Sequence, residues 1–399
     1  MKVYIVTKYG FPNGMAATRR IKCYARAIHD GGMKCEVIVC SCTELQKGKI
    51  KNTEARGIYE GVPFRYIGGT TTDTRPEPIR RFAQYLRLLK TERFLSRNLK
   101  KGDVLFFIMK ERIDIMLRLM KIAHKRKAFC IRDLCELPYG TGEETEKNIR
   151  LRKDTIEKQF PILDGIISIS DTLCNLAKTY TRPSCKHIKV PIMVEFEHYK
   201  MANKAFESET PYIFHAGTLS QQKDGILGMI EAFGMAVGKI TVPIKFVSTG
   251  KLQGAKHENG IKHLIAQYGL EEKIQFTGYL TEDELKENLS KATMVIINKY
   301  RTQQNNYCFS TKLGEYLAAA KPVIITNVGE ALNWLEDGKS AIVVEAEDTE
   351  ALVDAIVRVF NNPDEAQSIG QEGQEVCRCN FDYRVWSKPL VEFFNHLGD

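Results

Sequence analysis

The chain of 399 residues has no apolar run that approaches the ~20 residues needed by a membrane-spanning helix. Its start, MKVYIVTKYG, is too short and too strand-like for a secretory signal. Its eleven cysteines are scattered in or beside apolar strands, without the density of a disulfide scaffold. These absences argue against an integral membrane protein and against a secreted disulfide-rich domain. We expect a cytoplasmic protein.

Metal-binding and dinucleotide-binding patterns are also missing. Cys40/Cys42 and Cys377/Cys379 are C-x-C pairs, but neither has a histidine or a second cysteine pair at zinc spacing. The order Gly10-x-x-x-Gly14 lacks the G-x-G-x-x-G spacing of a dinucleotide site. We therefore expect free thiols and no metal site, and the glycine spacing weakens the case for a dehydrogenase.

Charge is present in quantity and is unevenly distributed. Residues 1–200 contain 39 Lys and Arg against 22 Asp and Glu, whereas residues 201–399 contain 19 against 27. A basic half can face nucleic acid, an anionic lipid surface or a phosphate-bearing substrate. The acidic half argues against a chain that wraps nucleic acid continuously.

Strands and helices alternate along almost the whole chain, and the pattern restarts near residue 212. Such alternation predicts parallel sheets covered on both faces, and two successive sets predict an α/β protein of two doubly wound domains. The first set of predicted strands is Lys2–Lys8, Lys34–Cys40, Val62–Ile67, Asp103–Met109, Ala128–Asp133, Gly165–Ser170 and His187–Pro191. The second set is Tyr212–Ala216, Ile244–Thr249, Ile274–Gly278, Met294–Asn298, Pro322–Asn327 and Ala341–Val344. Domains of residues 1–200 and 205–380 are expected, with the boundary in Met193–Pro211.

The segment Asn305–Ile324, NNYCFSTKLGEYLAAAKPVI, has the pattern of a phosphate cradle at the start of a helix. A helix is expected over Lys312–Ala320, with Ser310 or Thr311 as its N-cap. A helix N-terminus offers unpaired N–H groups and about half a positive charge, which together attract phosphate. The phosphate is expected beside Ser310, Thr311, Lys312 and Leu313. Glu315 suits the helix dipole, and it is also placed to accept hydrogen bonds from the two ribose hydroxyls of a nucleotide.

This segment is similar to the nucleotide-sugar-binding motif of GT-B glycosyltransferases, specifically the large retaining family often called family 4. Phe309–Ala318 resembles the Ser/Pro-x-Lys-Leu-x-Glu-Tyr-Leu-Ala form of many bacterial members. The resemblance makes Glu315 the second glutamate of a Glu-x7-Glu signature, and Tyr307 stands at the position of the first, beside the transferred sugar. It implies a GT-B fold, in which two Rossmann-like domains face each other across a cleft. It also implies that the terminal segment 381–399 packs back on the first domain.

The segment His215–Phe233 resembles a second motif of the family, Gly-Arg-x-x-x-x-Lys-Gly. It keeps Gly217 and Lys223 but has Thr218 where the arginine would be. Lys223 is expected to reach the diphosphate of the nucleotide sugar and to act as a catalytic cation. Arg301 is a candidate for the missing second cation, although an exposed loop arginine has the same pattern.

Glycines at strand ends complete the expected nucleotide-sugar site. Gly250 and Gly278 each follow a strand at its carboxyl end, where the lack of a side chain lets the backbone approach a ligand. The resemblance places the base and phosphates there, with Tyr279 beside the base. Each glycine alone is also an ordinary turn residue. In the first domain the resemblance implies that Gly14 enters the first helix next to the phosphates.

The loop Asp133–Gly142 follows a strand and therefore opens towards the expected cleft, where many relatives carry a histidine. No histidine is present in it. Asp133 and Glu136 are the candidate proton acceptors. A loop- or helix-capping role for Asp133 is equally compatible with the sequence.

The segment Ile79–Leu99 combines aromatic and aliphatic residues at helical spacing with six basic residues. Its stripe of Phe82, Tyr85, Leu86, Leu89 and Phe94 is typical of an interfacial helix on anionic lipid. A domain-surface helix with this stripe in the core and its charges in water has the same pattern. The sequence leaves both interpretations open.

Together these features predict a glycosyltransferase that moves a sugar from a nucleotide sugar, with UDP expected, to a glycan or lipid-linked acceptor of cell-surface polysaccharide assembly. No cofactor and no metal are expected, because the helix N-terminus and Lys223 take the place of a metal ion at the leaving diphosphate. Retention of configuration follows from the resemblance. Expected partners include an anionic membrane surface on the cytoplasmic side, but not nucleic acid. Two alternatives remain: a sugar-nucleotide epimerase of similar plan, and an inactive nucleotide-sugar-binding protein.

Overall fold

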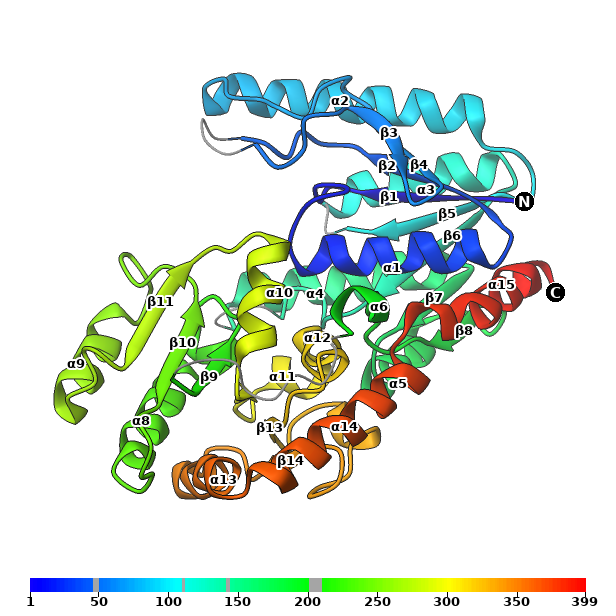
Figure 1. Cartoon of the computed structure of the whole chain (residues 1–399). Helices are drawn as coiled ribbons and strands as arrows, with labels where there is room; N and C mark the ends of the chain where they lie inside the picture. Colours follow the sequence, from blue (N-terminus) through cyan, green and yellow to red (C-terminus); the bar gives the residue numbers. More distant parts are fainter. Residues whose placement is uncertain (46–49, 110–111, 141–143, 201–209) are drawn as a thin grey trace. The chain divides into compact units, whose positions relative to one another are not determined.

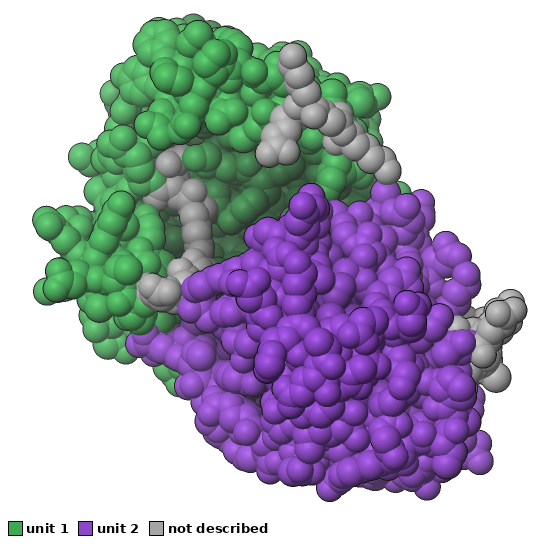
Figure 2. Space-filling model, turned by 90° about the vertical axis from the view of Figure 1, so that its left-hand side faces the viewer, with its two compact units in different colours: residues 1–193, 383–399 green, residues 194–382 purple. Residues whose placement is uncertain are grey.

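Two sheets organise the chain, which is described here by a computed structural model covering residues 1–399 except 46–49, 110–111, 141–143 and 201–209 (Figure 1). Each sheet belongs to its own unit, coloured separately in Figure 2. Unit 1 comprises residues 1–193 and 383–399, and unit 2 comprises residues 194–382. Residues 201–209 of the predicted boundary segment lie outside the described residues.

Unit 1 contains an eight-stranded sheet in the order β3-β4-β2-β1-β5-β6-β7-β8. All neighbours are parallel except β3 and β4, which are antiparallel. The strands are β1 (Lys2–Thr7), β2 (Lys34–Val39), β3 (Arg56–Tyr59), β4 (Val62–Tyr66), β5 (Val104–Ile108), β6 (Phe129–Leu134), β7 (Gly165–Ser168) and β8 (Lys186–Lys189). The helices are α1 (Ala16–Asp30), α2 (Glu77–Asn98), α3 (Ile113–Lys125), α4 (Glu146–Gln159), α5 (Asp171–Tyr180) and α15 (Ser387–Asn395), with short 3-10 turns η1 (Phe160–Ile162), η3 (Tyr383–Trp386) and η4 (His396–Gly398).

Unit 2 contains a six-stranded parallel sheet in the order β11-β10-β9-β12-β13-β14. The strands are β9 (Tyr212–His215), β10 (Lys245–Thr249), β11 (Ile274–Gly278), β12 (Met294–Ile297), β13 (Val323–Thr326) and β14 (Ile342–Val344). The helices are α6 (Phe196–Tyr199), α7 (Gln221–Asp224), α8 (Ile226–Val237), α9 (Glu258–Tyr268), α10 (Glu282–Lys291), α11 (Gln303–Tyr307), α12 (Lys312–Ala318), α13 (Thr349–Asn361) and α14 (Pro363–Asn380), with the 3-10 turn η2 (Ala331–Asn333).

Buried apolar strands explain why these sheets form. β5 and β12 are buried along their whole length, as expected for central parallel strands covered by helices on both faces. In Figure 1 the helices of each unit lie on both sides of its sheet. Numbered within unit 2, the strand order is 3-2-1-4-5-6, the doubly wound order, and the predicted fold class is therefore confirmed.

The C-terminal helix α15 belongs to unit 1, where it packs against α1. Leu390 and Phe394 are fully buried, and the Phe394 ring meets Phe106 of β5 edge-on. Trp386 packs against the same core while remaining partly exposed. Burying aromatic side chains of this size anchors the end of the chain to the sheet of unit 1.

Strand β3 was not predicted. It forms a hairpin with β4 through Glu60 and Gly61, both at positive φ (45° and 80°), as a two-residue hairpin turn requires. Its residues alternate between exposed and half-buried because it lies at the edge of the sheet. Its weak apolar content hid it from a search for buried strands.

Candidate functional site

The candidate site in unit 2 lies where the strand order reverses, between β9 and β12. Ligands of doubly wound sheets bind outside the carboxyl ends of the strands at this point. The segments that leave these two ends carry Gly217 after β9 and Lys299 after β12. Helix α12 is tied to the same edge, because the Ala216 N–H donates to the Tyr316 hydroxyl at 2.7 Å.

Helix α12 differs from its prediction at both ends. It spans seven residues, Lys312–Ala318, and Ala320 adopts a left-handed conformation (φ 53°) just before the next strand. Thr311 occupies the N-cap, one of the two predicted positions, but it has helical angles and its side chain makes no capping hydrogen bond. Instead, the Leu313 N–H donates to the Ser310 carbonyl at 3.1 Å. Glu315 is buried in the first turn.

Gly217 lies against a buried histidine and a buried aspartate. A Cβ at this position would lie 2.2 Å from His215 Nε2 and 3.0 Å from Asp224 Oδ2, so no larger residue fits without displacement. Thr249 holds the glycine from β10: the Gly217 N–H donates to its hydroxyl at 2.8 Å, and the hydroxyl donates to the Gly217 carbonyl at 2.9 Å. The glycine of the second sequence motif is therefore required sterically, whatever it binds.

Asp224 connects this turn to α12 through an ion pair with the Lys312 ammonium. Burial by itself would raise the pKa of Asp224, but the charge and hydrogen bond of Lys312, together with the nearby His215 and Lys299, outweigh it and lower the pKa to about 2. Burial, reinforced by the same lysine, lowers the pKa of His215 to about 4. At neutral pH the site thus combines a charged Lys312–Asp224 pair with a neutral histidine.

Lys299 is the functional candidate that the sequence analysis missed. Its ammonium lies 3.3 Å from Asn305 Oδ1, and the charges of Lys312, Asp224 and Lys223 all act on it. Burial lowers the pKa of Lys299, and the two neighbouring lysines lower it further. We call Lys223, Lys299 and Lys312 the lysine cluster. The charge of Asp224 acts on Lys299 together with those of the other two lysines, and cations gathered in this way attract an anion.

Arg301 does not join the lysine cluster. Its guanidinium is paired with Glu345 and donates to Asn327 Oδ1 at 3.1 Å, while its backbone N–H donates to Glu347 at 2.9 Å. Of the two interpretations left open by the sequence, the structure favours the exposed loop arginine over the missing cation. Lys299 and Arg301 both follow β12 closely, and only the conformation of the loop decides which of them lies beside Lys312.

The remaining predicted residues of unit 2 lie at the ends of strands, in the segments that follow them and in two short helices. Gly250 and Gly278 both have positive φ (98° and 75°) and exchange backbone hydrogen bonds of 3.1 and 3.2 Å. A Cβ on Gly250 would lie 3.0 Å from the Gly217 carbonyl, so this glycine also permits a close approach. Tyr279 follows directly and is 70% exposed. Three others, located after β9, in α7 and at the end of α11, are exposed or half-buried: Thr218, Lys223 and Tyr307.

In unit 1, Asp133 at the end of β6 is locked in a buried ion pair. The Arg20 guanidinium bonds both of its carboxylate oxygens at 2.8 and 3.0 Å, and the Tyr24 hydroxyl donates to it at 2.8 Å. Burial raises the pKa of Tyr24 well above its ordinary value, so the hydroxyl remains a donor. A carboxylate held by these partners is poorly suited to accept a substrate proton, and we reassign Asp133 to positioning. Glu136 is half-buried in the following loop, and its role as a proton acceptor stays a prediction.

Gly14 precedes α1 in the loop that follows β1. A Cβ there would lie 2.0 Å from the Thr18 hydroxyl, which donates to the Gly10 carbonyl at 2.7 Å. The glycine is thus needed to close this loop onto the start of α1, and the structure provides a local reason for it.

Side chains that could bind a metal ion come together outside the predicted site. Within the described residues, two groups place possible ligand atoms within 4.8 Å of one another: His124, Cys130 and Asp164, and Glu195, His198 and Glu282. None of these residues belongs to the predicted site. In the first group Asp164 already accepts from Arg182 and from the Cys130 N–H. The absence of a metal requirement remains a prediction.

Comparisons with known proteins find relatives for part of the chain in sequence. Residues 198–376 match the family model for glycosyl transferases group 1. The chain is 23% identical over 163 residues to an alpha-1,3/1,6-mannosyltransferase, ALG2, of Dictyostelium discoideum, covering 40% of this chain and 37% of that protein. It is 26% identical over 130 residues to a D-inositol 3-phosphate glycosyltransferase of Nocardioides sp., covering 31% of this chain and 27% of that protein. The match thus spans well under half the length of these relatives.

Solved structures resemble the whole chain. A sucrose-phosphate synthase from Thermosynechococcus elongatus matches this chain with a TM-score of 0.72 at 15% sequence identity. The match covers 100% of this chain and 99% of the synthase chain. The Anabaena protein Alr3699/HepE in complex with UDP-glucose matches this chain with a TM-score of 0.71 at 12% sequence identity. The match covers 99% of this chain and 100% of the Anabaena chain. The predicted GT-B fold is confirmed, and residues 198–376 carry the predicted resemblance to glycosyltransferases.

Proposed function

Residues 198–376 match the glycosyl transferases group 1 family, and from this match we propose that the chain transfers a sugar from a UDP-sugar to a glycan or lipid-linked acceptor. The observation that carries the proposal is the lysine cluster at the carboxyl edge of the unit 2 sheet. A nucleoside diphosphate is the anion expected at such an edge. Similar structures of Alr3699/HepE contain UDP and UDP-glucose, which favours UDP over other nucleotides.

In this proposal the lysine cluster stabilises the diphosphate as it leaves the sugar. Negative charge grows on the diphosphate in the transition state, and preorganised cations lower the free energy of that state. Lys312 is held in place by its ion pair with Asp224, and the charges of Lys312 and Lys223 both act on Lys299. The cations perform the electrostatic task of a metal ion, so we propose metal-independent transfer.

The resemblance to family-4-type enzymes supports retention of configuration. Tyr307 would lie beside the transferred sugar, and Tyr279 beside the base. In unit 1, Glu136 is the proposed proton acceptor, and the Arg20–Asp133 pair holds the end of β6 from which its loop leaves. Surface polysaccharide assembly remains the proposed setting.

An acceptor assay tests this function. Each of several labelled UDP-sugars is incubated with the protein, with glycans or polyprenyl phosphates, and with EDTA present. Transfer predicts a labelled acceptor and one UDP released per sugar. A nucleotide sugar that changes configuration without an acceptor would indicate the epimerase, and tight binding without any product would indicate the inactive binding protein. Either outcome contradicts the proposal.

Lys299 provides a prediction specific to this chain. Replacing it by methionine removes the ammonium but keeps the length of the side chain, and Asn305 retains its own bonds to Gln222 and Tyr300 carbonyls. A charged hydrogen bond contributes about 1.5–3 kcal/mol, so the Kd for UDP should rise roughly 10- to 150-fold in calorimetric titration.

The matched control is Arg301→Met, which removes a neighbouring cation held by Glu345. It should leave the Kd for UDP unchanged. The assignment of Lys299 would be wrong if the two variants weakened UDP binding equally, or if Lys299→Met weakened uridine as much as UDP.

A further inference from the structure

Helix α2 of unit 1 turns an apolar face to solvent. The exposed fractions are 50% for Ile79, 64% for Phe82, 50% for Tyr85 and 42% for Leu86. These residues are spaced three or four apart and therefore lie on one side of the helix. Large apolar side chains grouped in this way are unusual on a monomer surface and mark an interaction site.

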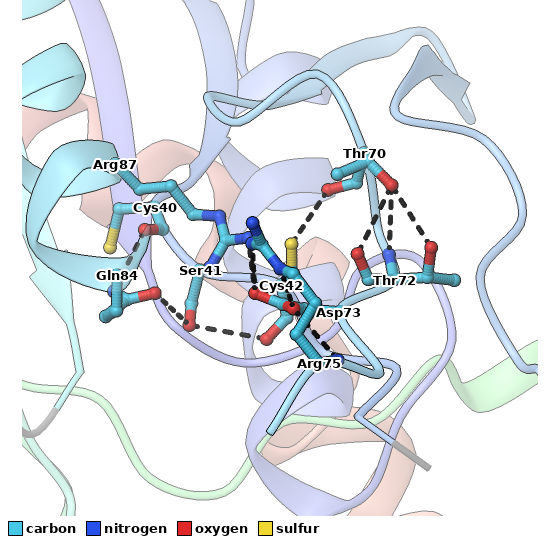
Figure 3. Close-up of polar contacts among 9 residues, drawn as sticks. All are labelled: Cys40, Ser41, Cys42, Thr70, Thr72, Asp73, Arg75, Gln84 and Arg87. Carbon is cyan, nitrogen blue, oxygen red and sulfur yellow. Dashed lines mark hydrogen bonds and ion pairs between the residues drawn. The ribbon is translucent and has the colours of Figure 1, made fainter. Parts of the chain in front are cut away.

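The opposite side of α2 packs on the core of unit 1, which leaves the apolar side in solvent. Ala83, Leu88 and Leu95 are buried, and so is Arg87, whose guanidinium donates to Asp73 at 2.6 Å. Figure 3 shows the Arg87 guanidinium directed at the Asp73 carboxylate and Gln84 contacting the segment after β2. The interpretation that places the whole stripe in the core is therefore wrong.

Polar contacts fix the helix in this orientation (Figure 3). Asp73 also accepts from the Arg75 guanidinium at 2.8 Å, so one buried carboxylate joins two arginines. Gln84 donates to the Cys40 carbonyl at 3.2 Å and accepts from the Ser41 hydroxyl at 3.3 Å. Rotating α2 to bury Phe82 and Tyr85 would break these contacts, so the exposed face is a stable feature of unit 1.

Basic residues occupy the same side of α2 in its C-terminal half. Lys90 follows Leu86 by four positions, Arg93 follows it by seven, and Arg97 follows Arg93 by four; all three are exposed. The two acidic residues of α2 are already in ion pairs, Glu77 with Arg81 and Glu92 with Arg118. We define the docking face as Ile79, Phe82, Tyr85, Leu86, Lys90, Arg93 and Arg97.

We propose that this docking face binds the surface of a bilayer that contains anionic lipid. Its aromatic and aliphatic half suits the boundary between headgroups and acyl chains, and its cationic half suits the negative surface. The face is a single exposed helix side rather than a groove, which fits a planar surface better than a peptide. The excess of basic residues in residues 1–200 adds long-range attraction to the same surface.

Vesicle cosedimentation of the full chain, without any nucleotide or acceptor, tests the proposal independently of sugar transfer. The protein should bind vesicles of phosphatidylcholine with phosphatidylglycerol, bind pure phosphatidylcholine poorly, and lose binding as salt increases. The double variant Arg93→Glu/Arg97→Glu should lower the partition coefficient about 30-fold or more, since each basic residue near the surface contributes about fivefold. The double variant Phe82→Ser/Tyr85→Ser should lower it about tenfold or more.

Matched controls alter the same properties on unit 2. Lys262→Glu/Lys291→Glu makes the same charge change on exposed lysines, and Val242→Ser removes an exposed apolar side chain. Both controls should partition like the wild type, and circular dichroism should show every variant folded. Equal effects of the control and docking-face variants, or no anionic-lipid binding by the wild type, would overturn the proposal. Self-association that depends on Phe82 without vesicle binding would replace it with a protein interface.

Discussion

Replacing Glu315 by glutamine should lower kcat/KM for the UDP-sugar roughly 100-fold or more. In the proposed site the buried carboxylate accepts hydrogen bonds from both ribose hydroxyls, and each bond to a charged acceptor contributes about 1.5–3 kcal/mol. Glutamine keeps the shape of the side chain but offers one oxygen and a competing N–H₂ group. Steady-state kinetics with the donor, once an acceptor is known, or calorimetry with UDP measures the loss.

The ligand provides the matched control for Glu315. Wild-type protein should bind 2′-deoxy-UDP much more weakly than UDP, because one of the two hydroxyl contacts is missing. In Glu315→Gln the two ligands should bind with similar affinity. Discrimination that survives the substitution would show that another residue recognises the ribose, and unfolding by the substitution alone would be visible as a lowered Tm without ligand.

Replacing Arg20 by methionine should destabilise unit 1 by about 3–5 kcal/mol. The side chains of Arg20 and Asp133 are 4% and 0% exposed, so removing the arginine leaves a buried carboxylate without its counter-charge. The Tyr24 hydroxyl and its 2.8 Å bond compensate for little of this charge. Denaturant unfolding followed by circular dichroism and by proteolysis assigns the loss to unit 1.

Arg112→Met is the control for this prediction, since it breaks an ion pair with Asp114 whose side chains are 75% and 57% exposed. An exposed pair contributes at most about 1 kcal/mol, so this variant should unfold almost like the wild type. Combining Arg20→Met with Asp133→Leu should restore part of the lost stability because no buried charge remains. A loss below about 1 kcal/mol for Arg20→Met would contradict the structural role of the pair.

The fold could be predicted because its evidence is local. Each central strand, such as β1 or β12, is a short buried apolar run, and the helices between them repeat with helical period. The edge strand β3 has no such run and depends on its pairing with β4, so the local pattern did not reveal it.

The candidate site could be predicted only in part, because its chemistry depends on tertiary contacts. The motif glycines and Glu315 were identifiable, yet the short, uncapped start of α12 was not. Choosing between Lys299 and Arg301 required the loop conformation, since both follow β12. Likewise, Arg20 lies 113 residues from Asp133, so no sequence pattern showed that this carboxylate is already bound.

Helix α2 is a second case in which the sequence predicted the element but not its contacts. Its periodicity correctly predicted a helix with an apolar stripe, but periodicity alone does not say which side faces the core. That side is determined by Arg87, which reaches the buried Asp73 and leaves Phe82 and Tyr85 in solvent. The distinction between a core stripe and an exposed one therefore required the structure.

The central claim is that unit 2 holds a nucleotide through its diphosphate, with the lysine cluster as the counter-charge. Calorimetric titration of UDP and of uridine in the presence of EDTA tests it most directly. The account predicts that UDP binds at least about 100-fold more tightly than uridine, since two or more charged contacts of about 1.5–3 kcal/mol are lost without the phosphates. Equal affinities, or UDP binding that disappears on chelation, would contradict it.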